Sequence, residues 1–368
     1  MLSYVYPGLA LVFTSGSLIS YKYLTEEREK KRTKQVFSHY LDQAVIDQVI
    51  DQPDKLKLGG EKHSLTVLFS DIKGFSTFSE QMSPQELVGF LNTYFDEMTE
   101  IIFKYQGTLD KLIGDAVMCF WGHPVETEEH PLRATIAALE MMQVVRQIQE
   151  SVNLPGGHRF DIRIGVNTGD MVVGNMGSQH RFSYTVMGDD VNLGARLEPL
   201  NKYYGTNILI SGSTYEKIKD RIFCRELDRV TVKGKEHPVT IYEPLGLRRP
   251  EREQRVSERR SDPTLWKRFK GAYVAGRHGE RRRSDRRQGS AELLVDPKWD
   301  EIRTIFEHAL ELYRIADFDG AEQAFDHVMK LAPGDGHSLM MKSRIEKFRL
   351  ELVDAKSEFD PVHKFDEK

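Results

Sequence analysis

Cysteine is scarce in this sequence, and the few cysteines present lack any metal-binding spacing. Only Cys119 and Cys224 occur among 368 residues, and they lie far apart in the chain. Two isolated cysteines without a CxxC pair build neither a disulfide framework nor a zinc site. We therefore predict that both are buried thiols of a protein in a reducing compartment.

An excess of charge of one sign is also missing. The 52 basic and 56 acidic residues leave a formal net charge of −4, which gives no global attraction for nucleic acid, so we expect no such partner. A content of 39% hydrophobic and 29% charged residues is typical of globular domains joined by polar segments. The length of the chain predicts two domains and linkers.

Residues 1–24 carry almost no charge. Between Leu2 and Leu24 only Lys22 is charged, and an apolar run of about 20 residues is long enough to span a membrane. Basic residues follow this run in YKYLTEEREKKRTK and none precedes it, which places the rest of the chain in the cytoplasm. We predict a single-pass transmembrane helix in a bacterial inner membrane. A cleaved signal peptide and a buried helix are the alternatives.

Residues 25–58 are first charged and then amphipathic. Apolar residues recur at three- and four-residue steps from Val36 to Ile50, and Pro53 ends the pattern. This predicts a juxtamembrane helix. Its apolar stripe either packs within the fold or pairs with its copy in a dimer.

Residues 59–246 alternate between strand-like and helix-like patterns. The apolar run SLTVLFSDI predicts a strand buried on both faces, and Ser83-Pro84 begins a long helix that Gly107 ends. Further along we expect two short strands around Gly114, a helix at 130–150, a hairpin at 160–177, a helix at 190–204 and closing strands. Interleaved strands and helices indicate an α/β or α+β domain.

The C-terminal third begins with a basic segment, 247–297, that is too polar to form a core. We expect a disordered spacer, with attraction to anionic lipid headgroups as the alternative. Residues 298–352 then predict a helical segment, in which 299–336 form two helices that resemble one tetratricopeptide repeat, and 353–368 form a tail. A single repeat cannot bury its own apolar face, so it packs on Leu339–Leu350, on another part of the protein or on a protein partner.

Two acidic residues stand where a cation would be needed. Asp71 ends the buried strand and is followed by a turn at Gly74-Phe75 whose backbone N–H groups could cradle phosphate oxygens. Asp115 lies in the predicted turn after Gly114. Two carboxylates together with substrate phosphates form the usual Mg²⁺ site. These spacings alone are common, and they give only a weak indication of metal binding.

Three longer runs make the indication specific. TVLFSDIKGFSTFSE, LDKLIGDAVMCFWG and RIGVNTGDMVVGNMGSQHRFSYTVMGDDVNLGARLE resemble the class III nucleotide cyclases, in the order and at the spacing of that family. The resemblance covers about residues 61–245. It implies an α+β fold, the ferredoxin-like α/β sandwich of the cyclase catalytic domain. The segment FSHYLDQAVIDQVI at 37–50 also resembles the signalling element that precedes this domain in membrane-linked members.

The resemblance assigns roles to individual residues. Asp71, Asp115 and the backbone carbonyl of Ile72 match the ligands of two Mg²⁺ ions, for which Mn²⁺ can substitute. Lys111 matches the position that reads adenine, where guanylate cyclases carry glutamate. The other matches are Thr185 as the partner of Lys111 in base recognition, Asn192 and Arg196 as the residues that position the ribose and stabilise the transition state, and Lys233 as a ligand of the terminal phosphates.

The resemblance also implies an assembly and an activity. In the family, the metal ligands of one chain and the base-reading residues of another form each site, so we expect a head-to-tail homodimer. Lys111 favours ATP, and we expect an adenylate cyclase that forms 3′,5′-cyclic AMP and pyrophosphate. The alternatives are a guanylate cyclase, a catalytically weak regulatory or dimerisation module, and a membrane-anchored scaffold. One departure is Gly194, where alanine is usual, and a glycine softens a helix.

Overall fold

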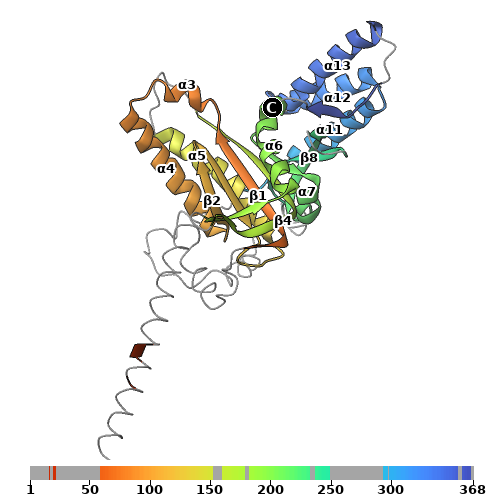
Figure 1. Cartoon of the computed structure of the whole chain (residues 1–368). Helices are drawn as coiled ribbons and strands as arrows, with labels where there is room; N and C mark the ends of the chain where they lie inside the picture. Colours follow the sequence, from red (N-terminus) through yellow and green to blue (C-terminus); the bar gives the residue numbers. More distant parts are fainter. Residues whose placement is uncertain are drawn as a thin grey trace, which may run out of the picture. The chain divides into compact units, whose positions relative to one another are not determined.

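The computed structural model describes residues 59–151, 160–178, 182–232, 237–248, 293–296, 298–354 and 359–365, and the single residues 16, 20 and 21. The chain divides into two units, Met1–Lys57 and Leu58–Lys368, and the second is described below (Figure 1). Apart from residues 16, 20 and 21, the predicted transmembrane helix at 1–24 lies outside the described residues, as do the helix at 25–58 and residues 249–292 of the basic segment. Within the described part, no helix is long and apolar enough to cross a membrane.

Four antiparallel strands form one side of the sheet. β1 (Gly59–Ile72) lies between β3 (Ala116–Trp121) and β4 (Ile162–Gly177), and β2 (Thr108–Ile113) pairs with β3 at the edge. Two long helices, α4 (Pro84–Lys104) and α5 (His130–Ser151), connect these strands. The β-α-β-β-α-β order with β1 and β3 in the middle is the ferredoxin-like arrangement. The predicted α+β class is therefore confirmed.

The sheet continues on the far side of β4. β6 (Ile208–Ser211) runs parallel to β4, and β8 (Val239–Leu247), β7 (Ile222–Val232) and β9 (His363–Phe365) follow in that order. β5 (Phe182–Met187) forms a hairpin with the outer half of β4. The shorter helices are α3 (Phe75–Ser79), α6 (Asp189–Tyr204) and α7 (Gly212–Ile218).

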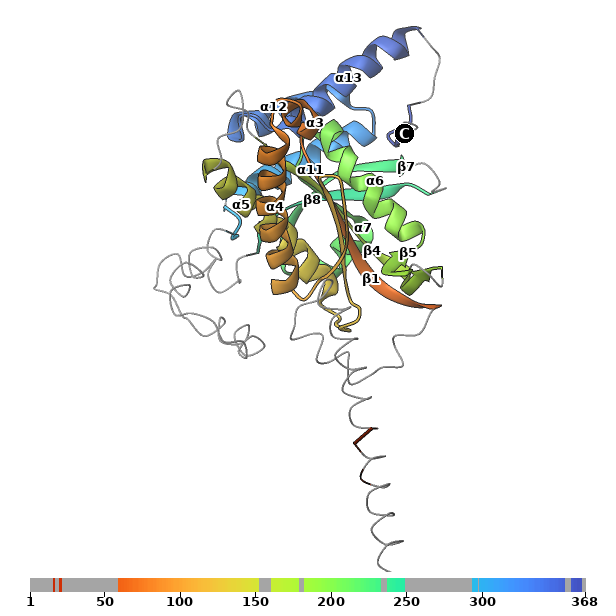
Figure 2. The same ribbon diagram turned by 60° about the vertical axis from the view of Figure 1, so that its left-hand side comes forward.

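The two faces of the sheet bury different helices. α4, α5 and α7 share one apolar core with β1, β3 and β4, and α6 packs on the opposite face (Figures 1 and 2). Ser83 begins α4 with a capping box, since its side chain accepts from the amide of Glu86 and its own amide donates to the Glu86 carboxylate. Both cysteines are buried, as predicted, and burial raises the pKa of Cys224 to about 12.

The hairpin predicted at 160–177 is wrong. Ile162–Gly177 form one strand, β4, which pairs with β1 from Ile162 to Asn175. The glycines that suggest turns are there because neighbouring atoms come close. A Cβ on Gly165 would lie 2.4 Å from the Glu198 amide, and one on Gly174 would lie 2.0 Å from the Gly59 carbonyl oxygen. Glycine in a strand therefore marks close packing here, as it does at other close backbone contacts.

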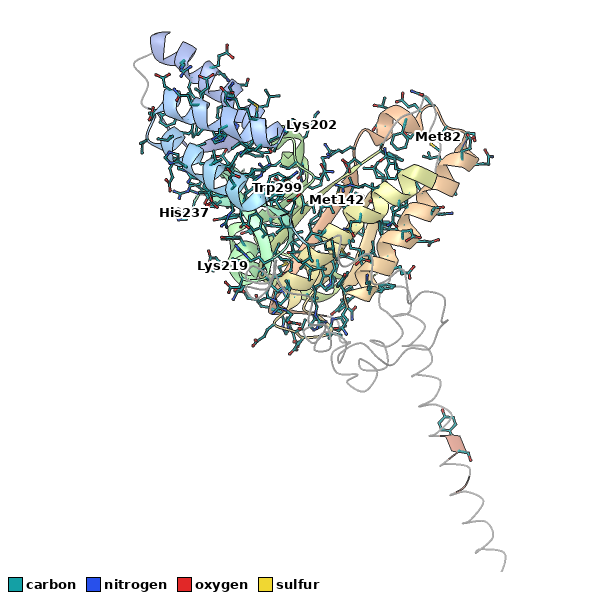
Figure 3. The ribbon with its side chains drawn as sticks, turned by 180° about the vertical axis from the view of Figure 1, so that it is seen from behind. Met82, Met142, Lys202, Lys219, His237 and Trp299 are labelled. Atoms are coloured by element: carbon teal, nitrogen blue, oxygen red, sulfur yellow. The ribbon has the colours of Figure 1, made fainter. Side chains whose placement is uncertain are left out.

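The C-terminal residues fold onto the same sheet. α11 (Lys298–Arg314), α12 (Phe318–Leu331) and α13 (Gly336–Asp354) share one apolar core with α6 and β7, and Trp299 at the start of α11 is labelled in Figure 3. The folded part starts earlier than the predicted boundary, because Leu293 and Val295 are buried and bond to Leu247. The helices agree with the pattern at 298–352, whereas the tetratricopeptide resemblance stays a prediction.

Candidate active site

Asp71 and Asp115 meet at one end of β1. Asp71 lies next to the last residue of that strand, and Asp115 occupies the β2–β3 turn, where Gly114 adopts a φ of 65°. The amide of Ile72 donates to the Asp115 carboxylate over 3.2 Å, which brings all three predicted metal ligands together. The left-handed conformation of Gly114 aims Asp115 back at the strand, and glycine adopts it at little cost.

The two carboxylates are placed so close that they repel each other. Burial, and then the negative charge of Asp71, raise the pKa of Asp115 to about 6. Like charges held together at a half-buried site favour a cation between them. Two carboxylates and a backbone carbonyl are hard oxygen donors, the ligand type that Mg²⁺ and Mn²⁺ prefer. The chemistry of this donor set therefore fits the expected divalent cations.

An arginine that the sequence reasoning missed lies beside this pair. Arg163 of β4 is the register partner of Asp71 and donates to its carboxylate over 2.8 Å. Its Nε also lies 2.9 Å from a carboxylate oxygen of Glu198 on α6. Burial raises the pKa of Glu198 to about 7; the charge of Arg163 opposes this shift, and the charges of Asp71 and Asp115 reinforce it. Arg163 therefore links the acid pair to α6.

A second group of residues forms where β2 approaches β5. Lys111 donates to the Thr185 hydroxyl over 3.3 Å, so the two predicted base-reading residues are in contact. Both also bind Asp110, which the sequence reasoning missed. Thr185 donates to one carboxylate oxygen over 2.6 Å, and the Lys111 ammonium lies 3.1 Å from the other. Because the Asp110 side chain is fully buried, it contacts Lys111 and Thr185 from the interior of the domain.

An irregularity in β2 explains how Asp110 reaches Thr185. The register of the β2–β3 pairing shifts between Leu109 and Lys111, which leaves Asp110 as the bulged residue. A bulge redirects a side chain out of the regular alternation. The only sequence signal for this role is a lone acid in an otherwise apolar strand next to Lys111. A charge inside an apolar run is likewise the signal for Arg163 in IRIGV.

Asn192 and Arg196 both lie on α6, and both side chains reach solvent. They are one turn apart on the helix and so share a face. Close packing fixes the helix on the sheet. A Cβ on Gly194 would lie 2.7 Å from the Val67 side chain, and one on Gly165 would lie 2.6 Å from the Gly194 carbonyl oxygen. Gly194 is therefore a contact position, which gives a packing reason for the departure from alanine.

The remaining predicted residues divide into two cases. Gly74 adopts a left-handed φ of 68° and precedes α3, whereas the Phe75 ring packs 5.5 Å from the ring of Phe78 at the edge of the core. Only the backbone of this turn is thus available for phosphate. Lys233 lies outside the described residues.

Within one chain the predicted residues fall into separate groups. Asp71, Ile72 and Asp115 form one group, and Lys111 and Thr185 form another with Asp110. Among the described residues, no hydrogen bond or ion pair joins the two groups, although Lys111 and Asp115 are close in sequence on one β-hairpin. The arrangement places Asp115 and Lys111, which belong to the same hairpin, in different surroundings.

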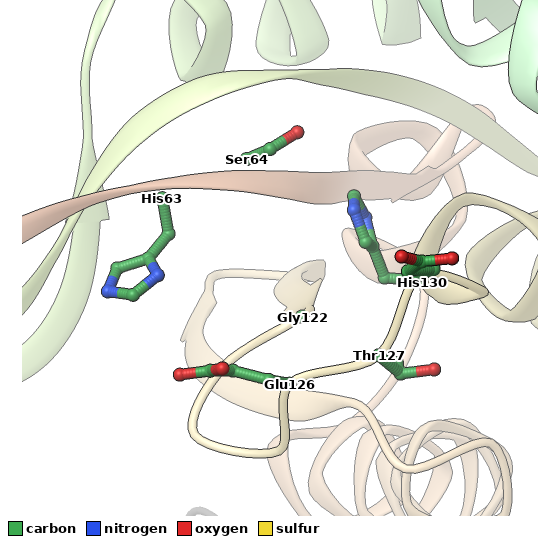
Figure 4. Close-up of a pocket in the computed structure, with 7 residues that line it drawn as sticks. His63, Ser64, Gly122, Glu126, Thr127 and His130 are labelled. Atoms are coloured by element: carbon green, nitrogen blue, oxygen red, sulfur yellow. The ribbon is translucent and has the colours of Figure 1, made fainter.

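A pocket of about 360 Å³ lies away from both groups (Figure 4). Its lining includes His63 of β1, His130 at the start of α5 and Glu126 on the loop between β3 and α5. His130 is bonded to the Thr66 hydroxyl over 2.8 Å, and burial lowers the pKa of His130 to about 4. The described part of the chain contains no cluster of three or more His, Cys, Asp or Glu side chains able to hold a metal. The pocket contains none of the predicted site residues.

Comparison with known proteins identifies the part of the chain that holds these groups. The family model described as the adenylate and guanylate cyclase catalytic domain matches residues 60–243, which include both groups and α6. Adenylate cyclase 1 of Rhizobium meliloti is 38% identical over 189 residues, covering 50% of this chain and 28% of that protein. The adenylate cyclase of Anabaena cylindrica is 32% identical over 222 residues, covering 58% of this chain and 43% of that protein.

A solved structure is similar as well. A bacterial light-regulated adenylyl cyclase is 26% identical with a TM-score of 0.50, and the match covers 62% of this chain and 65% of that one. The chain spans less than half the length of each of the two curated relatives named above. The similarity thus concerns the region of the predicted site, and the relatives contain long additional segments.

Proposed function

The chain belongs to the family of adenylate and guanylate cyclase catalytic domains, and on that premise we propose that it converts ATP into 3′,5′-cyclic AMP and pyrophosphate. The observation that carries the proposal is the contact between Lys111 and Thr185 on a shared buried acid, Asp110. An ammonium and a hydroxyl held together offer hydrogen bonds to a purine edge, and Thr185 can donate or accept. A glutamate in place of Lys111 would favour guanine.

The acid pair would hold the divalent cations. Asp71, Asp115 and the Ile72 carbonyl supply the ligands, and the bound cations would neutralise triphosphate charge and favour ionisation of the ribose 3′-hydroxyl. Arg163 keeps the Asp71 carboxylate in place through its 2.8 Å contact. Asn192 would hold the ribose, and Arg196 would place its permanent charge against the reacting phosphate. The reaction needs no covalent protein intermediate, because positioning and charge stabilisation suffice for phosphoryl chemistry.

We propose further that each site forms between two chains in a head-to-tail homodimer. The separation of the acid pair from the Lys111–Thr185 group within one chain supports this arrangement. Each chain then supplies metal ligands to one site and base-reading and transition-state residues to the other, which a two-fold axis makes equivalent. A monomer would hold two incomplete halves and would be inactive.

Complementation tests the shared site. Asp71→Asn and Arg196→Ala should each abolish cyclic AMP formation from ATP, assayed with Mg²⁺ and with Mn²⁺. Random pairing of the two variants makes half of the dimers mixed, each with one intact site, so the mixture should recover about a quarter of wild-type activity. A mixture that stays inactive at equal expression would refute the shared site. Turnover of GTP but not ATP by the wild-type chain would make it a guanylate cyclase.

Membrane attachment through residues 1–24 is part of this proposal and rests on the sequence alone. The full chain should sediment with membranes, and a chain lacking residues 1–24 should not. If both forms divided equally between the membrane and soluble fractions, residues 1–24 would not attach the chain to a membrane.

A further inference from the structure

The last turn of α6 is fixed by a buried polar chain that ends in the C-terminal helices. The Tyr204 hydroxyl donates to the Asp228 carboxylate of β7 over 2.8 Å, and Arg344 of α13 donates to the same oxygen over 2.6 Å. The side chains of Asp228 and Arg344 are each 5% exposed. A buried charge pair with this geometry holds its partners rigidly, because losing either member leaves the other unpaired.

Ring contacts at the same place strengthen the connection. The Tyr203 ring is stacked on His363 of β9 at 5.0 Å between centroids, and the Arg344 guanidinium lies 5.6 Å from the Tyr203 ring. The backbone of α13 also meets the end of α6, because a Cβ on Gly205 would lie 3.3 Å from the Gly336 Cα. The end of α6 is therefore enclosed by α13 and β9 together.

A second buried ion pair anchors α13 to the sheet. Arg225 of β7 lies 2.7 Å from Glu243 of β8 and 2.7 Å from Asp335, which precedes α13. Asp335 also accepts from the Ser338 amide over 2.9 Å and so caps the same helix. The start of α13 is thus held on β7 while its middle, at Arg344, meets α6.

α6 needs outside support beyond its middle. Pro199 lies inside the helix, and a proline there removes one internal hydrogen bond. The Asn201 side chain bonds the Ile164 carbonyl of β4 over 3.0 Å, and Gly194 packs on β1, so the helix rests on the sheet as far as Asn201. Beyond Asn201, the Tyr203 ring contacts His363 and Arg344 of the C-terminal segment. Arg196 lies eight residues before Tyr204, about 12 Å along a rigid helix.

From these contacts we infer that residues 293–365 are a positioning element for the catalytic domain, with Arg344 as the residue that sets the end of α6. This inference rests on the proposed function in one respect, the roles of Asn192 and Arg196. The C-terminal segment aligns these two side chains by holding the helix that carries them. In each site of the dimer, the C-terminal segment of the chain that supplies α6 has this effect. The C-terminal segment of the chain that supplies the metal ligands has none.

Hydrogen exchange on the full chain tests the coupling without reference to activity. Arg344→Met removes the pair with Asp228, and Arg349→Met is its matched control. Arg349 lies on the same helix and pairs with Glu322 and Asp319 of α12, away from α6. Exchange in 197–204 should rise at least several-fold in Arg344→Met and stay at the wild-type level in Arg349→Met. Equal exchange in wild type and Arg344→Met would overturn the inference.

A milder variant covers the case in which Arg344→Met does not fold. Tyr204→Phe removes one hydroxyl and keeps the ring, so its packing is retained while the bond to Asp228 is lost. It should raise exchange in the same residues by a smaller factor. An unchanged exchange pattern in folded Tyr204→Phe would also overturn the inference.

Mixed dimers test which half-site responds. In a mixture of Asp71→Asn and Arg196→Ala chains, the working site takes α6 from the Asp71→Asn chain. Adding Arg344→Met to that chain should lower turnover about tenfold with the KM for ATP within twofold, because the loss falls on groups acting in the transition state. Adding Arg344→Met to the Arg196→Ala chain should leave the activity within twofold of that of the unmodified mixture. Equal losses in both arrangements would mean general destabilisation and would overturn the inference.

The same experiments separate the two proposals. Wild-type protein that forms no cyclic AMP would refute the proposed function, while the exchange measurements would still decide whether the C-terminal segment holds α6. Active wild type with unchanged exchange in both variants would refute the positioning role alone.

Discussion

At the scale of single residues, Asp110 shows how a buried acid can organise two residues that are far apart in sequence. Its carboxylate binds Lys111 and Thr185 at once, and the amide of Val186 donates to it over 3.3 Å. A charged side chain that is fully buried is retained only where partners compensate its desolvation. Asp110 therefore fixes the orientation of both base-reading groups before any nucleotide arrives.

Replacement of Asp110 by asparagine should reduce base selectivity. Asp110→Asn keeps the shape but removes the negative charge that holds Lys111 and one strong acceptor for Thr185. Hydrogen bonds to charged groups contribute about 1.5–3 kcal/mol, so kcat/KM for ATP should fall about tenfold or more. The ratio of kcat/KM for ATP to that for GTP should fall as well, which steady-state assays with both nucleotides measure.

The control for this change is Asp96→Asn, which replaces an exposed acid on α4. It should leave both nucleotide activities unaltered. If Asp110→Asn kept wild-type kcat/KM for ATP while remaining folded, the buried carboxylate would have no part in base recognition.

The residues that could be predicted are those that belong to long motifs. Asp71, Asp115, Lys111 and the α6 pair are recognisable because each stands in a run of matching neighbours, and the structure brings the acids together as expected. Asp110, Arg163 and Glu198 could not be predicted, because each contacts a residue far away in sequence: Thr185 for Asp110, Asp71 for Arg163, and Arg163 for Glu198. Only folding shows that Arg163 meets Asp71 across two strands.

At the scale of elements, most boundaries follow from local chemistry, and the error in β4 has a physical reason. The capping box at Ser83 and the glycine turn at Gly114 are local signals, so the helix and hairpin there were predictable. The glycines of β4 look identical to turn glycines in sequence. They are glycines because α6 and β1 come too close for a side chain, and this approach depends on residues far away along the chain.

Gly194→Ala tests that close approach. An alanine favours a helix over glycine by about 1 kcal/mol, but its Cβ would lie 2.7 Å from the Val67 side chain. Overpacking of this kind costs about 1–3 kcal/mol, so the free energy of unfolding should fall or at best stay level in spite of the better helix former. Chemical denaturation of Gly194→Ala, Val67→Ala and the double variant measures the effect.

The double variant provides the control. Val67→Ala vacates the space that the new methyl group needs, so the two changes should couple by about 1 kcal/mol or more in the favourable direction. Suppose instead that Gly194→Ala stabilises the protein and that the effects of the two substitutions on the free energy of unfolding are additive. The helix would then not approach β1 as closely as described.

At the scale of the whole molecule, the sequence predicts the α+β domain and the C-terminal helices better than it predicts the contacts between them. The α+β domain and the C-terminal helices were both predictable, since each has its own apolar periodicity. Their shared core was not, because the side chains that join them, such as Arg344 and Asp228, are charged and look like surface residues in sequence. The face of α11–α13 turned toward α6 is already covered, so any protein partner would bind elsewhere on these helices.

The strands that carry Lys111 and Thr185, together with β4, also carry exposed apolar residues. These are Leu112 and Ile113 at the end of β2 and the paired residues Val172 and Met187 of β4 and β5. Neighbouring exposed apolar side chains mark interaction surfaces. Since the proposed dimer must bring a second chain next to the Lys111–Thr185 group, we expect these four residues to lie in the dimer interface.

Met187→Glu should therefore break the dimer and abolish activity together. A charge buried at an interface without a partner costs several kcal/mol, enough to separate chains at micromolar concentration. Leu339→Glu is the matched control, because Leu339 is a similarly exposed apolar residue on α13. Analytical ultracentrifugation should show monomers for Met187→Glu and dimers for Leu339→Glu, and wild-type specific activity should fall on dilution in step with the dimer fraction. Full activity of a monomeric Met187→Glu chain would show that one chain forms a complete site.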